Sequence, residues 1–210
     1  MTNAIDPRTP VLVGCGQITD TESLPSSGRS PSAFVAEAVR LALADARAAR
    51  GAEALAARLQ SISVMRFFSD SSPRFVQPHG RSLNPPRSVA NRIGAAAAGE
   101  FVYTEVGGNM PQYLINEYSE RIARGELDAA LVCGGELLRS AQIAQRQGIA
   151  LDWHEDPGGE PQSAGDTRLG WSEEEARHNL RAAIWFYPLL ENAIRGARGA
   201  TPEAHLQSMA

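Results

Sequence analysis

The sequence predicts a layered α/β fold in which helices pack on a sheet. Short apolar or alternating runs, which are typical of strands, occur at residues 11–16, 61–67, 101–106 and 128–133. Longer stretches with apolar residues at helical spacing separate most of these runs. This alternation is typical of β–α–β units, in which a crossover helix joins two parallel strands.

Length and charge limit the classes of protein to consider. The chain of 210 residues is long enough for one substantial domain with a good hydrophobic core. Its formal net charge is -4 and it has no dense basic block, so nucleic acid is not an expected partner. The amino terminus lacks a secretory pattern, and no apolar run approaches the roughly 20 residues of a membrane span. We therefore expect a cytoplasmic protein.

The first predicted strand, residues 11–16, contains two glycines that also occur in dinucleotide-binding turns. Gly14 and Gly16 match the first two positions of that fingerprint, but Thr19 replaces the third glycine. A polar stretch rich in serine, proline and glycine follows in place of an immediate helix. A nucleotide cofactor is therefore not predicted.

A long helix is predicted next. Ser30 or Ser32 would cap it, and Pro31 lies near its first turn. Gly51 is expected to divide the alanine-rich stretch that follows into two pieces. The alternating run at residues 61–67 would then form a β–α–β unit with the first strand. A short helix at residues 88–96 is predicted after a loop.

Neither of the two histidine-bearing loops predicts a metal site. His79 lies in a polar loop, residues 69–86, and we expect its side chain to be solvated because nothing nearby supplies a second ligand. His154, Glu155 and Asp156 adjoin one another in a later loop. Adjacent side chains on a loop do not converge easily on one ion, so no metal is expected there either.

The stretch of residues 101–136 is the most informative part of the sequence. Its first run, Phe101 to Val106, meets the double glycine Gly107 and Gly108, after which Asn109 opens a helix. Free N–H groups and the positive end of the helix dipole would favour an anionic or carbonyl-bearing ligand, and glycines would let it approach the backbone. The alternative interpretation is a turn of purely structural role.

The end of that helix and the strand after it follow familiar signals. Gly125 is placed to end the helix, and the apolar run at residues 128–133 predicts a strand buried on both faces. Cys133 lies in this strand and Cys15 in the first one. We expect both thiols to be inert core groups, although the sequence leaves a disulfide between them open. Cys133 also lacks the helix-start position that would lower its pKa.

The pattern is weaker in the last third of the chain. A helix is predicted at residues 137–148, a loop at 152–170 and a helical region at 173–198. Pro188 should kink or divide this last region. The dense apolar patch around Pro188 fits core packing and contact with a ligand equally well.

The stretch of residues 101–136 resembles the nucleophile-bearing unit of the thiolase superfamily. In that family a strand, turn and long helix are followed by a Gly-Glu/Gln-x-Asp turn, an apolar strand and a Gly-Gly-x-Glu-type end. The segments Gly125-Glu126-Leu127-Asp128 and Gly134-Gly135-Glu136 are similar to that pattern, the second without the spacer residue. The Gly-Gly-Asn-x-Pro-Gln turn at residues 107–112 looks most like thiolase-like proteins described as acetyl-CoA acetyltransferases.

The resemblance implies a thiolase-like layered fold with a mixed sheet, and an acyl-CoA acyltransferase homologue of lipid metabolism. Active thiolases carry a cysteine at the start of this helix, and the family's spacing places Gly108 there. We therefore expect no catalytic residue, no resident cofactor and no thiolase turnover by the chain alone. Gly107, Gly108, Asn109 and Gln112 would instead hold the thioester carbonyl of an acyl-CoA or another small polar group.

The resemblance covers residues 9–208 and corresponds to the N-terminal half of a thiolase-like protein. Residues 1–210 would form one such domain, with a core at 9–136 and a loop and helical extension at 137–210. The strand from Phe101 to Val106 pairs with its copy in thiolase dimers, so we expect a homodimer through this strand or a partner chain carrying the missing half. The alternatives are a non-catalytic acyl-CoA-binding or assembly subunit, and an inactive scaffold fragment that acts through partner binding.

Overall fold

The computed structural model describes residues 6–21, 28–72, 75, 78–167 and 170–210. The chain forms two compact units, Met1–Asp166 and Thr167–Ala210. The first unit contains every strand found in the described residues.

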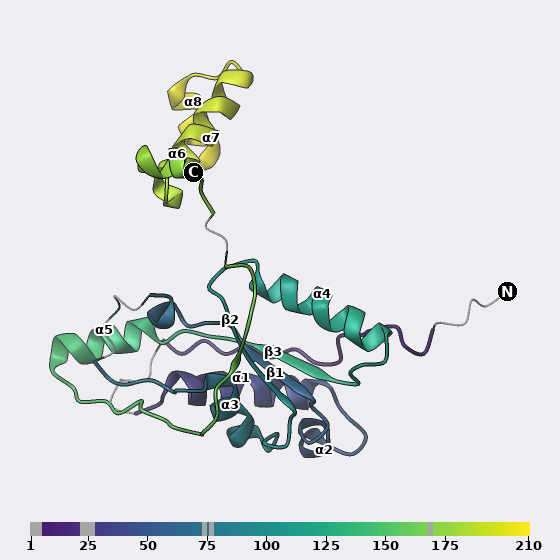
Figure 1. Cartoon of the computed structure of the whole chain (residues 1–210). Helices are drawn as coiled ribbons and strands as arrows, with labels where there is room; N and C mark the ends of the chain where they lie inside the picture. Colours follow the sequence, from purple (N-terminus) through teal and green to yellow (C-terminus); the bar gives the residue numbers. More distant parts are fainter. Residues whose placement is uncertain (1–5, 22–27, 73–74, 76–77, 168–169) are drawn as a thin grey trace. The chain divides into compact units, whose positions relative to one another are not determined.

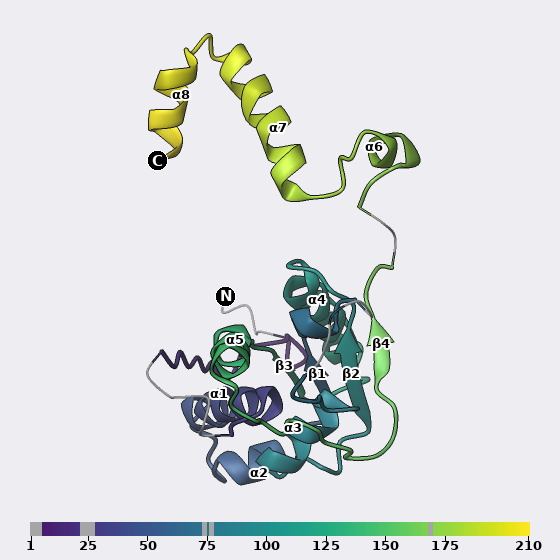
Figure 2. The same cartoon turned by 90° about the vertical axis from the view of Figure 1, so that its left-hand side faces the viewer.

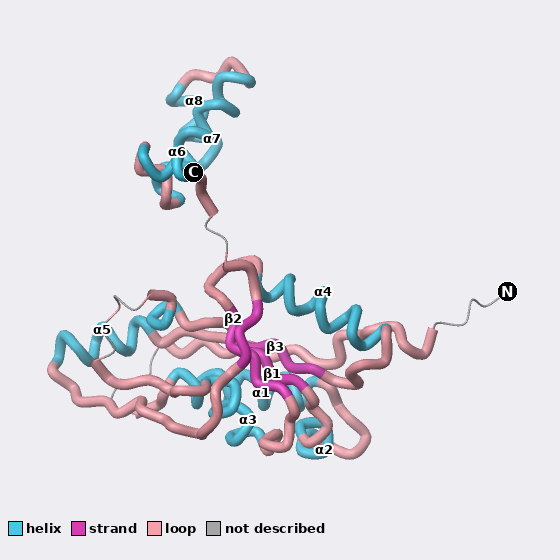
Figure 3. The backbone as a smooth tube through the Cα atoms, viewed as in Figure 1, coloured by secondary structure: helices cyan, strands magenta, loops and turns pink. Residues whose placement is uncertain are grey.

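Four parallel strands form one sheet at the centre of the first unit (Figure 3). They lie in the order β3-β1-β2-β4, and their bounds are β1 (Ser61–Val64), β2 (Glu100–Thr104), β3 (Ala130–Cys133) and β4 (Gln162–Ala164). The predicted α/β class is confirmed. The expected mixed sheet is wrong, because each strand pair among the described residues is parallel.

Helices cover both faces of this sheet (Figure 1, Figure 2). Three helices lie on one face: α1 (Pro31–Asp45), α2 (Ala52–Ala56) and α3 (Pro85–Ile93). α4 (Met110–Ala123) lies on the opposite face, and α5 (Leu138–Gln147) follows β3. Parallel pairing requires crossover segments of this kind, which explains the alternation of strands and helices along the chain.

Several helix ends follow the local sequence signals. The Ser30 hydroxyl accepts a hydrogen bond from the backbone N–H of Ala33 at 3.2 Å, which confirms Ser30 as the cap of α1. Gly51, with φ 87°, separates α1 from α2 as predicted. Gly125, with φ 74°, follows the end of α4. Glycine adopts these positive φ angles without the steric penalty of a Cβ.

The main core lies between the sheet and the face covered by α1 and α3. Ile62 and Val64 of β1 are fully buried in it, together with Val35 of α1 and Val89 of α3. β1 is buried along its whole length, because strands occupy both of its edges. β3 lies at the edge of the sheet and is half-buried, so its predicted burial on both faces is wrong.

α4 packs on the opposite face through Leu114 and Tyr118. The Tyr118 hydroxyl shares a hydrogen bond of 2.8 Å with the buried Ser61 hydroxyl and a second bond with the Ser63 hydroxyl. Successive residues of a strand point to opposite faces of the sheet. β1 therefore turns its serines toward α4 and its aliphatic side chains toward α1, and Tyr118 satisfies both buried hydroxyls.

Residues 11–16 form no strand, so that prediction and the β–α–β unit built on it are wrong. β1 pairs directly with β2 and β3, which fills both of its edges. The segment instead lies against α1, where a Cβ on Gly14 or Gly16 would stand within 2.3 Å of a backbone oxygen of that helix. Glycine at these two positions permits the close contact. The apolar side chains of the segment stay exposed: Val11, Leu12 and Val13.

β4 lies in the stretch that the sequence predicts as a loop. It pairs with β2 over three residues, with Val102 opposite Gln162 and Thr104 opposite Ala164. β2 is therefore an internal strand with a neighbour on each of its edges. A homodimer through the strand from Phe101 to Val106 would need the edge that β4 occupies, so the structure corrects this prediction as well.

The described residues of the second unit form three helices, α6 (Glu173–Arg177), α7 (Ala183–Ala197) and α8 (Pro202–Met209). A capping box formed by Ser172 and Glu175 begins α6. α7 continues through Pro188, so this residue does not divide the helix. The His205 Nε2 atom of α8 lies 2.9 Å from the Glu191 carboxylate of α7, which links the two helices.

Replacing Tyr118 with Phe should destabilise the first unit by about 1–3 kcal/mol, because the buried hydroxyls of Ser61 and Ser63 lose their shared partner. Equilibrium unfolding in urea measures this change. Tyr113 lies on the exposed side of α4, so Tyr113→Phe is the matched control and should leave the midpoint unchanged. Equal shifts of the urea midpoint for the two variants would contradict the role given to the Tyr118 hydroxyl.

Candidate functional site

The predicted ligand-binding residues lie in the turn between β2 and α4. Gly107, Gly108 and Asn109 are exposed there, and α4 begins at the next residue. The Asn109 side chain makes no capping bond to the helix; its Oδ1 atom lies 2.5 Å from where a Cβ on Gly107 would stand. The backbone of Gly108 is open, since a Cβ there would meet no atom within 4 Å. The structure thus brings these three residues together on the surface.

Gln112 lies one turn further along α4 and is also exposed. Its Nε2 atom donates to Asn116 Oδ1 at 2.8 Å, so its amide is engaged along the helix surface. α4 has 14 residues, and its amino end gives the turn a partial positive charge. The polarity of the turn suits an anionic or carbonyl group.

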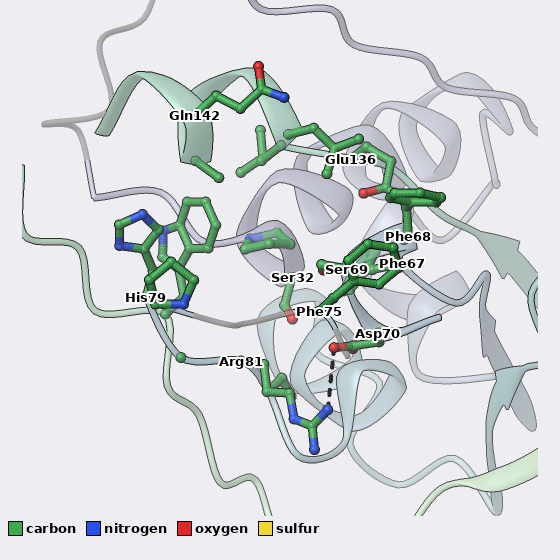
Figure 4. Close-up of a pocket in the computed structure, with 18 of the residues that line it drawn as sticks. Ser32, Phe67, Phe68, Ser69, Asp70, Phe75, His79, Arg81, Glu136 and Gln142 are labelled. Carbon is green, nitrogen blue, oxygen red and sulfur yellow. Dashed lines mark hydrogen bonds and ion pairs between the residues drawn. The ribbon is translucent and has the colours of Figure 1, made fainter. Parts of the chain in front are cut away.

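A cavity of about 200 Å³ lies beyond the carboxyl ends of β1 and β3 (Figure 4). The short 3₁₀ helix η2 (Phe68–Asp70), which follows β1, forms one side, and residues 136–145, which follow β3, form another. The chain passes from β1 to β2 on one side, whereas β3 lies on the other side of β1. The carboxyl ends of β1 and β3 therefore lie side by side. Ligands of open parallel sheets bind outside the carboxyl ends of the strands.

Much of the cavity wall is aromatic or aliphatic. Two rings of the segment after β1, Phe67 and Phe68, face the space together with Leu137 and Leu138 from the segment after β3. The indole of Trp153 adds a further apolar surface. Walls of this kind bind the apolar body of a small molecule, while a few polar groups fix its orientation.

Glu136 contributes a carboxyl group to this wall. The Glu136 Oε1 atom accepts a hydrogen bond from the backbone N–H of Phe68 at 2.6 Å, which joins the segments after β3 and β1. Burial raises the pKa of Glu136, and the charge of Asp70 adds to this effect, although the bond from Phe68 opposes it. Within the described part of the chain, no cation forms an ion pair with Glu136.

Asp70 is the second carboxyl group of the cavity, and its side chain is only 5% exposed. Its Oδ2 atom accepts a hydrogen bond from the Tyr103 hydroxyl at 2.7 Å, and its Oδ1 atom lies 3.5 Å from the half-exposed guanidinium of Arg81. Burial, followed by the bond to Asp70, raises the pKa of Tyr103, so the phenol stays a donor. The Tyr103 oxygen accepts the backbone N–H of Phe67 at 3.0 Å, which anchors the segment after β1.

His79 and Trp153 close another side of the cavity, with their rings edge to face at 5.3 Å. His79 is 8% exposed, so its predicted solvation is wrong; Trp153, which is distant in sequence, covers it. His79 Nε2 and Trp153 Nε1 are buried without a hydrogen-bond partner among the described residues. Both atoms are enclosed within the wall and do not face the open space of the cavity.

Neither cysteine provides an activated nucleophile. The Cys133 thiol donates to the backbone oxygen of Ser63 at 3.3 Å, and burial raises the pKa of this thiol to about 12. Such a thiol is protonated at neutral pH, and the thiolate is the reactive form. Cys15 is exposed, which corrects its predicted burial, and neither thiol forms a disulfide.

No group of three or more histidine, cysteine, aspartate or glutamate side chains arranged to hold a metal occurs in the described residues. Glu155, which adjoins His154, has a structural role. Its Oε1 atom accepts bonds of 2.7 Å from the Ser30 hydroxyl and from the Arg92 guanidinium. The loop is thereby tied to both α1 and α3.

Sequence reasoning did not assign the cavity residues to a site. They come from segments distant in sequence, and the clearest members are Asp70, His79, Glu136 and Trp153. A usable signal was present, because polar residues that follow two adjacent parallel strands meet at the same edge of the sheet. Because of the lengths of the loops after β1 and β3, the sequence alone does not show that these polar residues lie close together.

Comparison with known protein families, curated proteins and solved structures found no match to this chain. Among the described residues, no helix has both the length and the apolar character needed to cross a membrane. The chemistry of the α4 turn and of the cavity is therefore the basis for a functional conclusion.

Replacing Glu136 with Gln should stabilise the folded chain at neutral and alkaline pH. The folded state raises the pKa of this carboxyl above its ordinary value of 4.5, so the ionised form costs stability once the pH exceeds the raised pKa. Well below pH 4.5 the carboxyl is protonated in both the folded and the unfolded state, so the difference in stability should vanish. Urea midpoints across this pH range measure the effect.

The matched control is Glu126→Gln, which removes an exposed carboxylate whose pKa Arg124 lowers. This variant should show no gain in stability at any pH. A Glu136→Gln protein less stable than the natural chain at pH 8 would contradict the account of the cavity.

Proposed function

We propose that the chain is a thiolase-like acyl-CoA acyltransferase homologue that binds coenzyme A thioesters without turnover of its own. The observation that carries the proposal is the exposed turn before α4, where the Gly108 backbone is open and the Asn109 amide does not cap the helix. Backbone N–H groups at such a helix start would hold the thioester carbonyl. The sequence resemblance of residues 101–136 supports the same class of ligand.

The absence of turnover follows from the chemistry that acyl transfer requires. A thiolate must take the acyl group to form a covalent intermediate. Gly108 carries no side chain, and the protonated Cys133 thiol is bonded to Ser63 within the sheet. The chain would therefore bind an acyl-CoA and present it, without cleaving it.

Calorimetric titration of the full chain with acetyl-CoA and with free coenzyme A tests this proposal. Acetyl-CoA should bind more tightly than free coenzyme A, because only the thioester supplies the carbonyl. Asn109→Ala should weaken acetyl-CoA binding up to about tenfold, the effect of one lost hydrogen bond. The exposed Asn91 of α3 provides the control, and Asn91→Ala should bind normally. A folded protein that binds neither compound would reject the site.

An assembly role is the second candidate, and α7 favours it. Six large apolar side chains of this helix are 41–71% exposed: Ile184, Trp185, Tyr187, Leu189, Leu190 and Ile194. Soluble proteins rarely leave so many neighbouring apolar side chains uncovered, and a helix that is apolar on several sides is usually buried against another surface. We propose that a second copy of the chain covers α7.

Light scattering over a range of protein concentrations measures this association. The double variant Ile184→Gln, Leu189→Gln should shift the protein toward the monomer mass, because it replaces two exposed apolar side chains with polar ones. Arg198→Gln, an exposed change at the end of the same helix, is the control and should leave the mass unchanged. A natural chain that stays monomeric at every concentration would contradict self-association.

A further inference from the structure

We infer that the cavity beyond β1 and β3 binds a small organic cation, an ammonium group attached to an aromatic or aliphatic body. This inference is independent of acyl-CoA binding, because none of the cavity residues belongs to the turn before α4. It rests on the charge and the aromatic wall of the cavity.

The charge of the wall favours a cation. The described lining contains two carboxyl groups, Asp70 and Glu136, and one guanidinium, Arg81. Arg81 is half-exposed and lies beside Asp70, whereas no described residue supplies an ion-pair partner for Glu136. Glu136 is exposed, so an ammonium group bound in the cavity can reach its carboxylate and supply a counter-charge.

The apolar wall adds to this preference. Phe67, Phe68 and Trp153 line the same space as Glu136. The faces of aromatic rings attract cations, most strongly when the site is shielded from water. The volume of about 200 Å³ is smaller than the roughly 300–1,000 Å³ of pockets for drug-sized ligands, so the guest is small.

The two carboxyl groups of the lining define the class of ligand further. An anionic ligand would be repelled by two carboxyl groups, and a neutral ligand would leave Glu136 without a counter-charge.

Three probes of similar size separate these possibilities in titrations of the full chain followed by NMR at about pH 8. They are 2-phenylethylammonium, 2-phenylethanol and 3-phenylpropanoate. The ammonium compound should bind at least about tenfold more tightly than the alcohol, because only the cation compensates Glu136. The carboxylate compound should not bind. The indole N–H resonance of Trp153, assigned with Trp153→Phe, should shift with the ammonium compound.

Glu136→Gln tests the origin of the preference. It keeps the size of the side chain and an oxygen to accept the Phe68 N–H, so it should fold; circular dichroism confirms this. The variant should bind the ammonium compound about tenfold more weakly and the alcohol as before. Glu126→Gln, a surface change away from the lining, should behave as the natural chain.

Three results would overturn the inference. The first is equal binding of the ammonium compound and the alcohol, and the second is ammonium binding that Glu136→Gln does not alter. The third is the absence of binding by all three probes to the folded natural chain. Acetyl-CoA titration of the same samples is a separate measurement, so failure at the α4 turn and failure at the cavity are distinguishable.

Discussion

The pairing of β1 on both of its edges is the constraint on which the rest of the first unit depends. β2 and β3 lie parallel to it, with Ile62 between Phe101 and Leu131 in the register. The pleat then sends Ile62 to the main core and the neighbouring serines to Tyr118. A shift of one residue would exchange these faces and bury serines against aliphatic side chains, so the two unlike faces of β1 specify the register.

The same parallel pairing creates the cavity. The carboxyl ends of β1 and β3 lie side by side, so η2 and Glu136 meet although they are far apart in sequence. Burial of the Glu136 carboxyl is a cost to the folded chain, as the raised pKa of this group indicates. An acid with a raised pKa beside aromatic rings is the kind of local conflict that binding sites retain, because a ligand can compensate it.

The cavity and the α4 turn offer opposite chemistry. The turn presents open glycine backbone and the positive end of a helix dipole, which suit an anionic or carbonyl group. The cavity is enclosed by rings and carries an excess of carboxyl groups, which suit a cation. The two proposed sites would therefore take different functional groups and would not compete for one ligand. α7 adds exposed apolar side chains, on which the proposed self-association rests.

The sequence by itself determined the α/β class, the strands near residues 61, 101 and 130, and the helix ends at Ser30 and Gly125. These features depend on residues within a few positions of one another, through caps, turns and periodicity. Only the tertiary structure decided that β4, and not residues 11–16, completes the sheet, and that Trp153 buries His79. Strand pairing and burial depend on contacts between distant segments, and no local pattern states which edge of a sheet is free.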